Sequence, residues 1–172
     1  NLENSFIEFI NKTPPTGKSI ICTDSKNIKQ ILNKIKNKNI LTYGENKESN
    51  YQISNIKYNI DNTNFDLSFK DREKNKKKIK NINVKLLGKH NVLNAAAAFI
   101  VCLNLGVEKN IIKKSLKSFS GVQRRMTKVF SKNNNDFYDD YAHHPTEISS
   151  ILEGVHNVNV KRKIISVFEP HR

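Results

Sequence analysis

Hydrophobic residues in the first half of the chain recur at two different spacings. Apolar positions from Leu2 to Ile10 follow a helical period, which predicts a helix that ends at Pro14-Pro15. Short apolar runs at 19–23 and 40–43 indicate buried strands, and residues 28–35 between them again show helical spacing. A strand, a helix and a second strand in this order are typical of a βαβ unit with a parallel sheet.

The spacing of apolar residues shortens between residues 51 and 87. This alternation predicts three strands, near 53–58, 65–69 and 82–86, which we expect to be antiparallel. The stretch with the densest positive charge, residues 70–80, contains acidic residues and lacks interleaved aromatics. We interpret it as a solvated hairpin or loop rather than a binding patch.

The second half of the chain divides into two segments at a break near residues 121–124. Before the break, the pattern predicts an almost wholly apolar helix at 91–105, closed by Gly106, and a shorter helix at 109–116. After it, we predict strands at 126–130 and 137–140, a helix at 145–155 and a strand at 164–168. The fold class is therefore α/β, with one unit over residues 1–122 and the start of a second over residues 123–172.

Composition narrows the choice of partners. The net charge of +14 would suit nucleic acid or an anionic surface. However, the chain contains 25 Lys, only five Arg and 25 Asn spread along its length, which indicates a general compositional bias, and we expect no nucleic-acid partner. Two distant cysteines, with no leader peptide and no apolar run near the roughly 20 residues of a membrane span, predict a reduced, cytoplasmic setting.

One motif is misleading. Residues 16–19, Thr-Gly-Lys-Ser, match the end of a phosphate-binding P-loop. That loop requires a glycine where Lys12 stands, and it requires a strand before and a helix after, whereas the predicted order here is the reverse. We interpret the segment as a turn.

Residues 88–95 form the first candidate site. Asn91 and Asn94 lie three residues apart at a predicted helix start, so their carboxamides project from nearly the same face. A carboxamide can pair with adenine N6 and N7. The alternative is that Asn91 caps the helix and Asn94 faces solvent.

Residues 121–125 form the second candidate site, at the predicted break. Arg124 and Arg125 keep their charge at all relevant pH values and can fork onto phosphate oxygens. The alternative is an ordinary surface pair.

The third candidate site is the polar run from Asp139 to Glu147, between a predicted strand and a predicted helix. Ligands in α/β proteins bind at the carboxyl ends of strands, and an exposed helix start favours anions. His143 and His144 have the unperturbed pKa that suits positioning a substrate or moving protons. We predict no metal site, because no other Cys or His with ligand spacing accompanies them. The alternative is a polar connection in which Pro145 merely starts a helix.

In their order and spacing, the three motifs resemble the Mur ligases of peptidoglycan synthesis. The carrying residues are Gly-x-His-Asn-x-x-Asn-Ala, Gly-Val-x-Arg-Arg, Asp-Asp-Tyr-Ala-His-His-Pro-Thr-Glu-Ile and the final Phe-Glu-Pro-His-Arg. The resemblance is close from about residue 86 onward and looser upstream. It implies that residues 1–122 are the C-terminal part of a central mononucleotide-binding ATPase domain. Residues 123–172 would begin a Rossmann-like C-terminal domain.

The resemblance also implies a reaction and roles for individual residues. It is closest to the branch that uses ATP and Mg²⁺ to activate UDP-N-acetylmuramate as an acyl phosphate, which the amino group of L-alanine attacks. His90, Asn91 and Asn94 would then bind the nucleotide, Arg125 would reach its phosphates and Asp140 its ribose. A final group would lie on the amino-acid side: His143, His144, His171 and Arg172. The resemblance implies a catalytic role for Arg125, His143 and His144.

The family's phosphate loop and metal ligands do not occur in this sequence. We therefore expect an internal fragment that is inactive alone, with a separate chain as a possible source of the missing half. Three alternatives stay open: a murein-peptide recycling ligase of the same family, a non-catalytic basic nucleic-acid-binding module, and a non-functional remnant. Glu147 and the final Pro-His-Arg favour the L-alanine branch over the recycling ligase.

Overall fold

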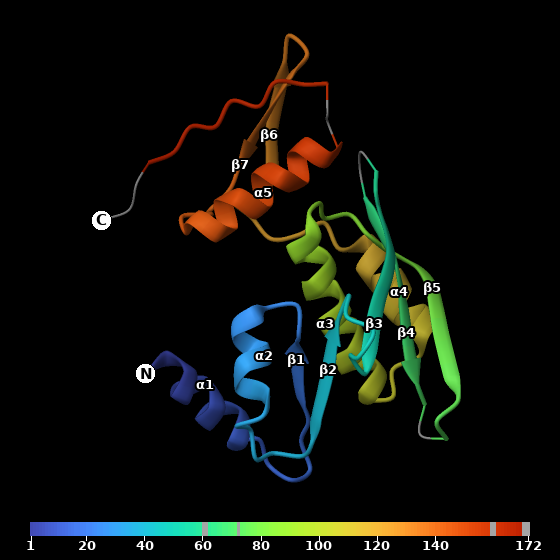
Figure 1. Ribbon diagram of the computed structural model, residues 1–172. Coiled ribbons are helices and arrows are strands. Elements are labelled where there is room, and N and C mark those ends of the chain that lie inside the picture. Colours follow the sequence, from blue (N-terminus) through green and yellow to red (C-terminus); the bar gives the residue numbers. More distant parts are fainter. Residues whose placement is uncertain (60–61, 72, 159–160, 170–172) are drawn as a thin grey trace.

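A five-stranded sheet organises the first part of the molecule, and a hairpin with one helix forms a smaller second part (Figure 1). The computed structural model describes residues 1–59, 62–71, 73–158 and 161–169. The strands of the sheet follow the order β1-β2-β3-β4-β5. The mixture of helices and a partly parallel sheet confirms the predicted α/β class.

The N-terminal segment contains the expected βαβ unit. Helix α1 (Leu2–Asn11) ends before the two prolines, and strand β1 (Ser19–Cys22) follows. Helix α2 (Lys26–Leu32) then connects to strand β2 (Ile40–Gly44). Strands β1 and β2 pair in parallel, with Ser19 opposite Ile40. The structure therefore confirms the predicted βαβ unit.

Three antiparallel strands complete the sheet. They are β3 (Tyr51–Tyr58), β4 (Thr63–Lys70) and β5 (Lys76–Val84), and β3 joins the βαβ unit by parallel pairing with β2. The lysine-rich stretch forms the β4–β5 hairpin, as expected from its solvated composition. The carboxyl ends of β1 and β2 point to the same edge of the sheet because these two strands run parallel.

Helices α3 (Lys89–Asn104) and α4 (Lys109–Ser118) supply the other side of the core. Phe99 of α3 and Phe65 of β4 are both fully buried in one hydrophobic cluster with Ile82 of β5. A fully buried side chain of this kind stabilises the fold by about 1.5–3 kcal/mol. The long apolar stretch therefore forms a buried helix on the sheet. No helix in the described part of the chain has both the length and the apolar character needed to cross a bilayer.

The second part contains strands β6 (Thr127–Lys132) and β7 (Asn135–Asp139), followed by helix α5 (Pro145–Val158). Asn133 and Asn134 connect the two strands with φ angles of 49° and 61°. Asparagine tolerates this left-handed region better than most residues, and a two-residue turn of this kind matches the twist of a hairpin. These three elements agree with the predicted strand, strand and helix.

The predicted strand at 164–168 is wrong. Residues 163–169 have no regular secondary structure, and Ile165 and Val167 are largely exposed. An apolar run becomes a strand only when another strand satisfies its backbone N–H and C=O groups. No described segment pairs with this run.

Candidate functional site

The candidate residues gather where the second part of the molecule meets the start of α3. Gly154 is the only buried residue of α5, and it packs on the backbone of Gly88. A side-chain carbon at Gly154 would lie 3.0 Å from Gly88 Cα. Two glycines therefore allow the helix and the α3 start to approach closely. The sequence reading did not single out Gly154, although a glycine inside a helical pattern is a signal of close packing.

His90 lies in this junction, half-buried at the second position of α3. Burial lowers the pKa of its imidazole; the Asp140 and Glu147 carboxylates oppose that shift and the Arg125 guanidinium adds to it. The ring therefore lies near three charged side chains of the second part. His90 Nδ1 is buried and has no hydrogen-bond partner among the described residues.

The two asparagines of the first motif have different surroundings. Asn91 Nδ2 donates to the Leu87 carbonyl at 2.8 Å, whereas Asn94 is exposed and makes no side-chain hydrogen bond within the described chain. The alternative that Asn91 caps the helix is wrong, because Gly88 occupies the N-cap position. The Asn94 carboxamide and the Asn91 Oδ1 atom are available to a ligand.

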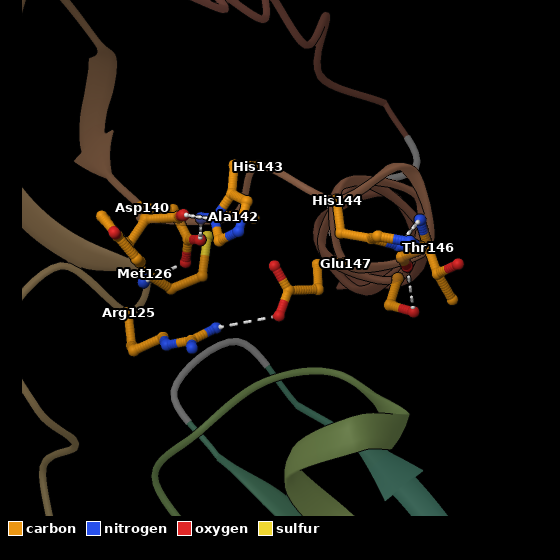
Figure 2. Close-up of polar contacts among 10 residues, drawn as sticks. Arg125, Met126, Asp140, Ala142, His143, His144, Thr146 and Glu147 are labelled. Atoms are coloured by element: carbon orange, nitrogen blue, oxygen red, sulfur yellow. Dashed lines mark hydrogen bonds and ion pairs between the residues drawn. The ribbon is translucent and has the colours of Figure 1, made fainter. Parts of the chain in front are cut away.

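The Asp140 carboxylate connects two segments at the start of the second part. Its Oδ2 atom accepts a hydrogen bond from Met126 N and its Oδ1 atom accepts one from Ala142 N, both at 2.7 Å (Figure 2). The carboxylate therefore ties the turn after β7 to the start of β6. Each oxygen keeps a further lone pair, so this bracing role leaves Asp140 able to accept from a ligand hydroxyl.

The two arginines of the second motif have separate partners. The Arg124 side chain lies 3.6 Å from the Asp139 carboxylate and its guanidinium stacks over the Tyr141 ring, 5.0 Å from the centroid. Arg125 extends towards Glu147, with a closest N···O distance of 4.0 Å (Figure 2). Arg125 is held only loosely and is the arginine that can turn towards an anion at the junction.

His144 and Glu147 cap the start of α5. His144 Nδ1 accepts from Thr146 N at 3.3 Å. Burial opposes ionisation of Glu147, but the backbone N–H groups of His143 and His144, with the Arg125 charge, hold the pKa of its carboxyl below the usual range. The Glu147 carboxylate thus accepts from the His144 backbone while the His144 side chain accepts from Thr146 N, an arrangement similar to a capping box. Part of the third motif is therefore structural.

The two histidines do not form a matched pair. Figure 2 shows Glu147 between the His143 and His144 side chains. His143 Nδ1 lies 3.1 Å from the Tyr141 carbonyl, and its ring packs edge-on against the Tyr141 ring at 5.2 Å. His143 therefore faces the turn after β7, whereas His144 faces the start of the helix that follows it. His171 and Arg172 lie outside the described residues.

The carboxyl ends of β1 and β2 add a further polar group to the junction. Asp24 Oδ1 accepts from Glu45 N at 2.9 Å, while Asp24 Oδ2 is buried without a hydrogen-bond partner in the described chain. Lys89, the first residue of α3, forms an ion pair with Glu45, and that hydrogen bond is the main cause of its raised pKa. The sequence reading missed Asp24, although it directly follows a predicted strand.

Three buried polar atoms that have no hydrogen-bond partner within the described residues therefore flank the start of α3: Asp24 Oδ2, His90 Nδ1 and Glu147 Oε2. Buried polar atoms normally find a hydrogen-bond partner, so such a group points to a ligand site. Among the described residues, no set of three His, Cys, Asp or Glu side chains is arranged to hold a metal ion. The site supplies amide, carboxylate, imidazole and guanidinium groups to a polar, anionic ligand.

Sequence models of two domains match the chain. The Mur ligase middle domain matches residues 1–102, and the Mur ligase glutamate ligase domain matches residues 124–172. The break between the two matches contains α4 and the approach to β6.

Individual relatives match over the whole chain. The UDP-N-acetylmuramate–L-alanine ligase of Pelagibacter ubique (strain HTCC1062) is 47% identical over 172 residues, which are 100% of this chain and 37% of that protein. The enzyme of the same name from Hydrogenobaculum sp. (strain Y04AAS1) is 39% identical with the same coverage. The crystal structure of the Thermotoga maritima UDP-N-acetylmuramate-alanine ligase matches with a TM-score of 0.77 and 27% identity, over 98% of this chain and 36% of that one. The chain thus spans a little over a third of these relatives.

Proposed function

Because the chain belongs to the Mur ligase family, we propose that it supplies part of an ATP-dependent ligase that joins L-alanine to UDP-N-acetylmuramate. It spans 37% of the length of the first two relatives, so the proposal concerns the share of the site that these residues build. That share is the junction between α3 and the second part. We place the domain boundary between residues 122 and 123, and the reaction in the cytoplasm.

One observation carries this proposal: three buried polar atoms without a hydrogen-bond partner in the described chain surround the start of α3, beside the Asn94 carboxamide and the Asn91 Oδ1 atom. We assign adenine to Asn91 and Asn94, since carboxamides match its N6 and N7 atoms. Asn94 is exposed and free of side-chain hydrogen bonds in the described chain, and Asn91 keeps its Oδ1 atom. His90 would face the nucleotide from the inner side of the same turn.

Two charged residues of the second part would bind the other groups of the nucleotide. Arg125 would leave its loose contact with Glu147 for the nucleotide phosphates, because a phosphate group accepts two parallel guanidinium bonds. Asp140 would accept from ribose hydroxyls with its free lone pairs while it continues to brace the turn. In this arrangement, ligand binding and the seating of the second part depend on each other.

We assign the amino-acid side to His143 and His144, with the neighbouring terminal residues His171 and Arg172. The contact of His143 Nδ1 with the Tyr141 carbonyl places the ring beside the turn after β7. The acceptor nitrogen of a neutral imidazole could receive a proton from an incoming amino group. Mg²⁺ would neutralise the nucleotide phosphates, with ligands from outside this chain. The phosphate loop would come from residues outside these 172, with a separate chain as one source.

A nucleotide-binding experiment tests the adenine and phosphate assignments separately. Calorimetric titration with ATP and with adenosine should give weaker binding of both ligands to the Asn94→Ala variant, by about tenfold. The Arg125→Ala variant should bind ATP about tenfold or more weakly yet bind adenosine as before.

Two surface substitutions serve as controls for these titrations. Asn110→Ala lies on α4, and Arg162→Ala removes a side chain that pairs with Asp136, and neither should change nucleotide binding. Equal effects of Asn94→Ala and Asn110→Ala would contradict the adenine assignment. The isolated chain should form no amide from UDP-N-acetylmuramate, L-alanine and ATP, and detectable product would contradict the proposed division of the site. The relatives' names favour L-alanine, and no observation favours the recycling ligase.

A further inference from the structure

Positive charge is concentrated in one stretch of the chain. Residues 70–117 contain 13 Lys and Arg against three Asp and Glu, a net charge of +10, which leaves +4 for all other residues. A general bias towards lysine would distribute the charge in proportion to length. The bias inferred from composition therefore does not account for this stretch.

The fold places three of these lysines, all on α4, in one hollow beside strand β5. Helix α4 lies beside the edge strand β5 (Figure 1), and Lys113 Nζ donates to the Lys80 carbonyl at 2.9 Å. A hollow of about 420 Å³ lies between them. It is lined by three lysines and three asparagines: Lys113, Lys114, Lys117, Asn64, Asn81 and Asn83. Ammonium groups and carboxamides therefore line one concave surface, and the Asn64 and Asn83 amide groups donate to neighbouring asparagines.

Structural roles account for only some of these lysines. Lys77 and Lys78 pair with Asp71 and Asp66, and lysines on an edge strand such as β5 discourage pairing with other chains. No lysine of α4 forms an ion pair with any carboxylate in the described chain. Lys117 complements the C-terminal end of the helix dipole, but Lys109 lies at the opposite end, where a cation is unfavourable. Lys113 donates to the Lys80 carbonyl, so Lys109 and Lys114 are the α4 lysines for which the described chain shows no such role.

Exposed apolar side chains lie next to the α4 lysines. Leu105, Val107 and Ile111 lie at the start of α4 or in the loop before it, and Leu105 is 78% exposed. Phe119 follows the helix and is also exposed. Residues 105–119 contain no Arg and only this one aromatic ring. Single-stranded nucleic acids are bound by series of stacking aromatics, whereas lysines beside aliphatic residues are typical of helices that lie in a membrane interface.

We propose that α4, the loop before it and β5 form a surface that binds an anionic lipid bilayer. Lipid phosphates neutralise the lysines of the hollow, and the aliphatic residues enter the boundary between headgroups and acyl chains. Lysine suits this partner because a bilayer presents many mobile phosphates and needs no fixed bidentate geometry. The surface is separate from the junction at the start of α3, so the inference does not depend on the proposed function.

Vesicle co-sedimentation tests this surface with the chain as it is. The protein should sediment with phosphatidylcholine vesicles that contain phosphatidylglycerol, about tenfold or more strongly than with phosphatidylcholine alone, and added salt should release it. The combined substitutions Lys113→Glu, Lys114→Glu and Lys117→Glu should abolish most of this binding. The neutral combination Lys113→Ala, Lys114→Ala and Lys117→Ala should give a smaller loss in the same direction, which guards against misfolding of the first variant.

A matched control separates location from net charge. Lys26→Glu, Lys29→Glu and Lys38→Glu change the charge equally at exposed positions in and after α2. This control should retain binding within about threefold, since charges beyond a Debye length of the bilayer contribute little. Ile111→Ser should weaken binding to vesicles while leaving binding to a heparin column unchanged. The proposal is overturned if the control loses as much as the α4 variants, if both vesicle types bind equally, or if duplex DNA binds more tightly than the anionic vesicles.

Discussion

The two parts of the molecule differ sharply in how they are stabilised. All 17 buried hydrophobic residues belong to the first part, between Ile10 and Ile112, whereas Gly154 is the only buried residue described in the second part. Yet the candidate catalytic side chains come from the second part. The first part thus offers a rigid base at α3, and the second holds charged groups by local hydrogen bonds. Such a division suits a site that is completed by ligand binding.

The largest effect should come from the core of the first part. Phe99→Ala removes a fully buried ring from the contact between α3 and the sheet. We expect a loss of about 3–5 kcal/mol in the free energy of unfolding, from the lost burial and the cavity left behind. Urea denaturation followed by circular dichroism measures it. A loss below about 1 kcal/mol would mean that α3 is not the base of the first part.

A smaller and more local effect should follow from Asp140→Ala. The substitution removes the acceptor of two 2.7 Å hydrogen bonds, from Met126 N and Ala142 N. Bonds to a charged group contribute about 1.5–3 kcal/mol, so amide hydrogen exchange at these two positions should accelerate strongly. Exchange in β3, β4 and β5 should not change. Faster exchange throughout the sheet would show that the two parts unfold together.

The contact between the parts is tested by Gly154→Val. The new side chain would overlap the Gly88 backbone, which lies 3.0 Å from even the first added carbon. Overpacking of this kind costs about 1–3 kcal/mol, and we expect α5 to move away rather than the core to unfold. The Cε1 proton of His90, followed by NMR, should then titrate closer to the ordinary pKa of histidine. An unchanged titration would contradict the role of this contact.

Phe137→Ala probes the hairpin of the second part. Phe137 stacks on Phe130 with ring centroids 4.1 Å apart, but both rings are about half exposed. A surface aromatic pair is worth about 1 kcal/mol, so global stability should change little. Thermal unfolding compared with Phe99→Ala measures the contrast directly. Equal losses of stability in the two variants would contradict the view that buried packing is concentrated in the first part.

The smallest effect concerns pH. Burial lowers the pKa of His90, so the folded chain keeps this ring neutral at pH values where the unfolded chain already binds a proton. The free energy of unfolding should therefore fall as the pH drops below the unfolded pKa of about 6.5. His90→Gln should reduce that slope. The lowered pKa of Asp66 affects stability only at more acidic pH. If the stability of the His90→Gln variant changes with pH near neutrality as that of the unsubstituted chain does, this role for His90 is excluded.

Local periodicity predicted most of the elements because burial on one face imposes a short-range pattern. The βαβ unit, the three antiparallel strands and helix α5 were all readable in this way. The strand expected at 164–168 was not, because a strand depends on a partner that its own residues do not specify. The sequence pattern also did not predict the role of Gly154, which lets α5 approach α3. A close approach depends on both surfaces that meet, and local spacing describes only one of them.

The sequence predicted which residues form the candidate site better than it predicted the contacts that they make. The three motifs and their order identified the family, and the structure places His90 near Asp140 and Arg125. Their spacing did not reveal that Asp140 braces a turn, that His144 caps α5 or that Asp24 joins the junction. Those roles depend on which backbone N–H groups the fold leaves without partners.

By itself, the sequence determined the elements, the family and the chemical groups available, because these follow from residue identity and short-range order. The tertiary structure decided which groups meet: an orphaned imidazole and two orphaned carboxylate oxygens around the start of α3, and the α4 lysines beside β5. Proximity between residues distant in the chain arises from packing and strand pairing.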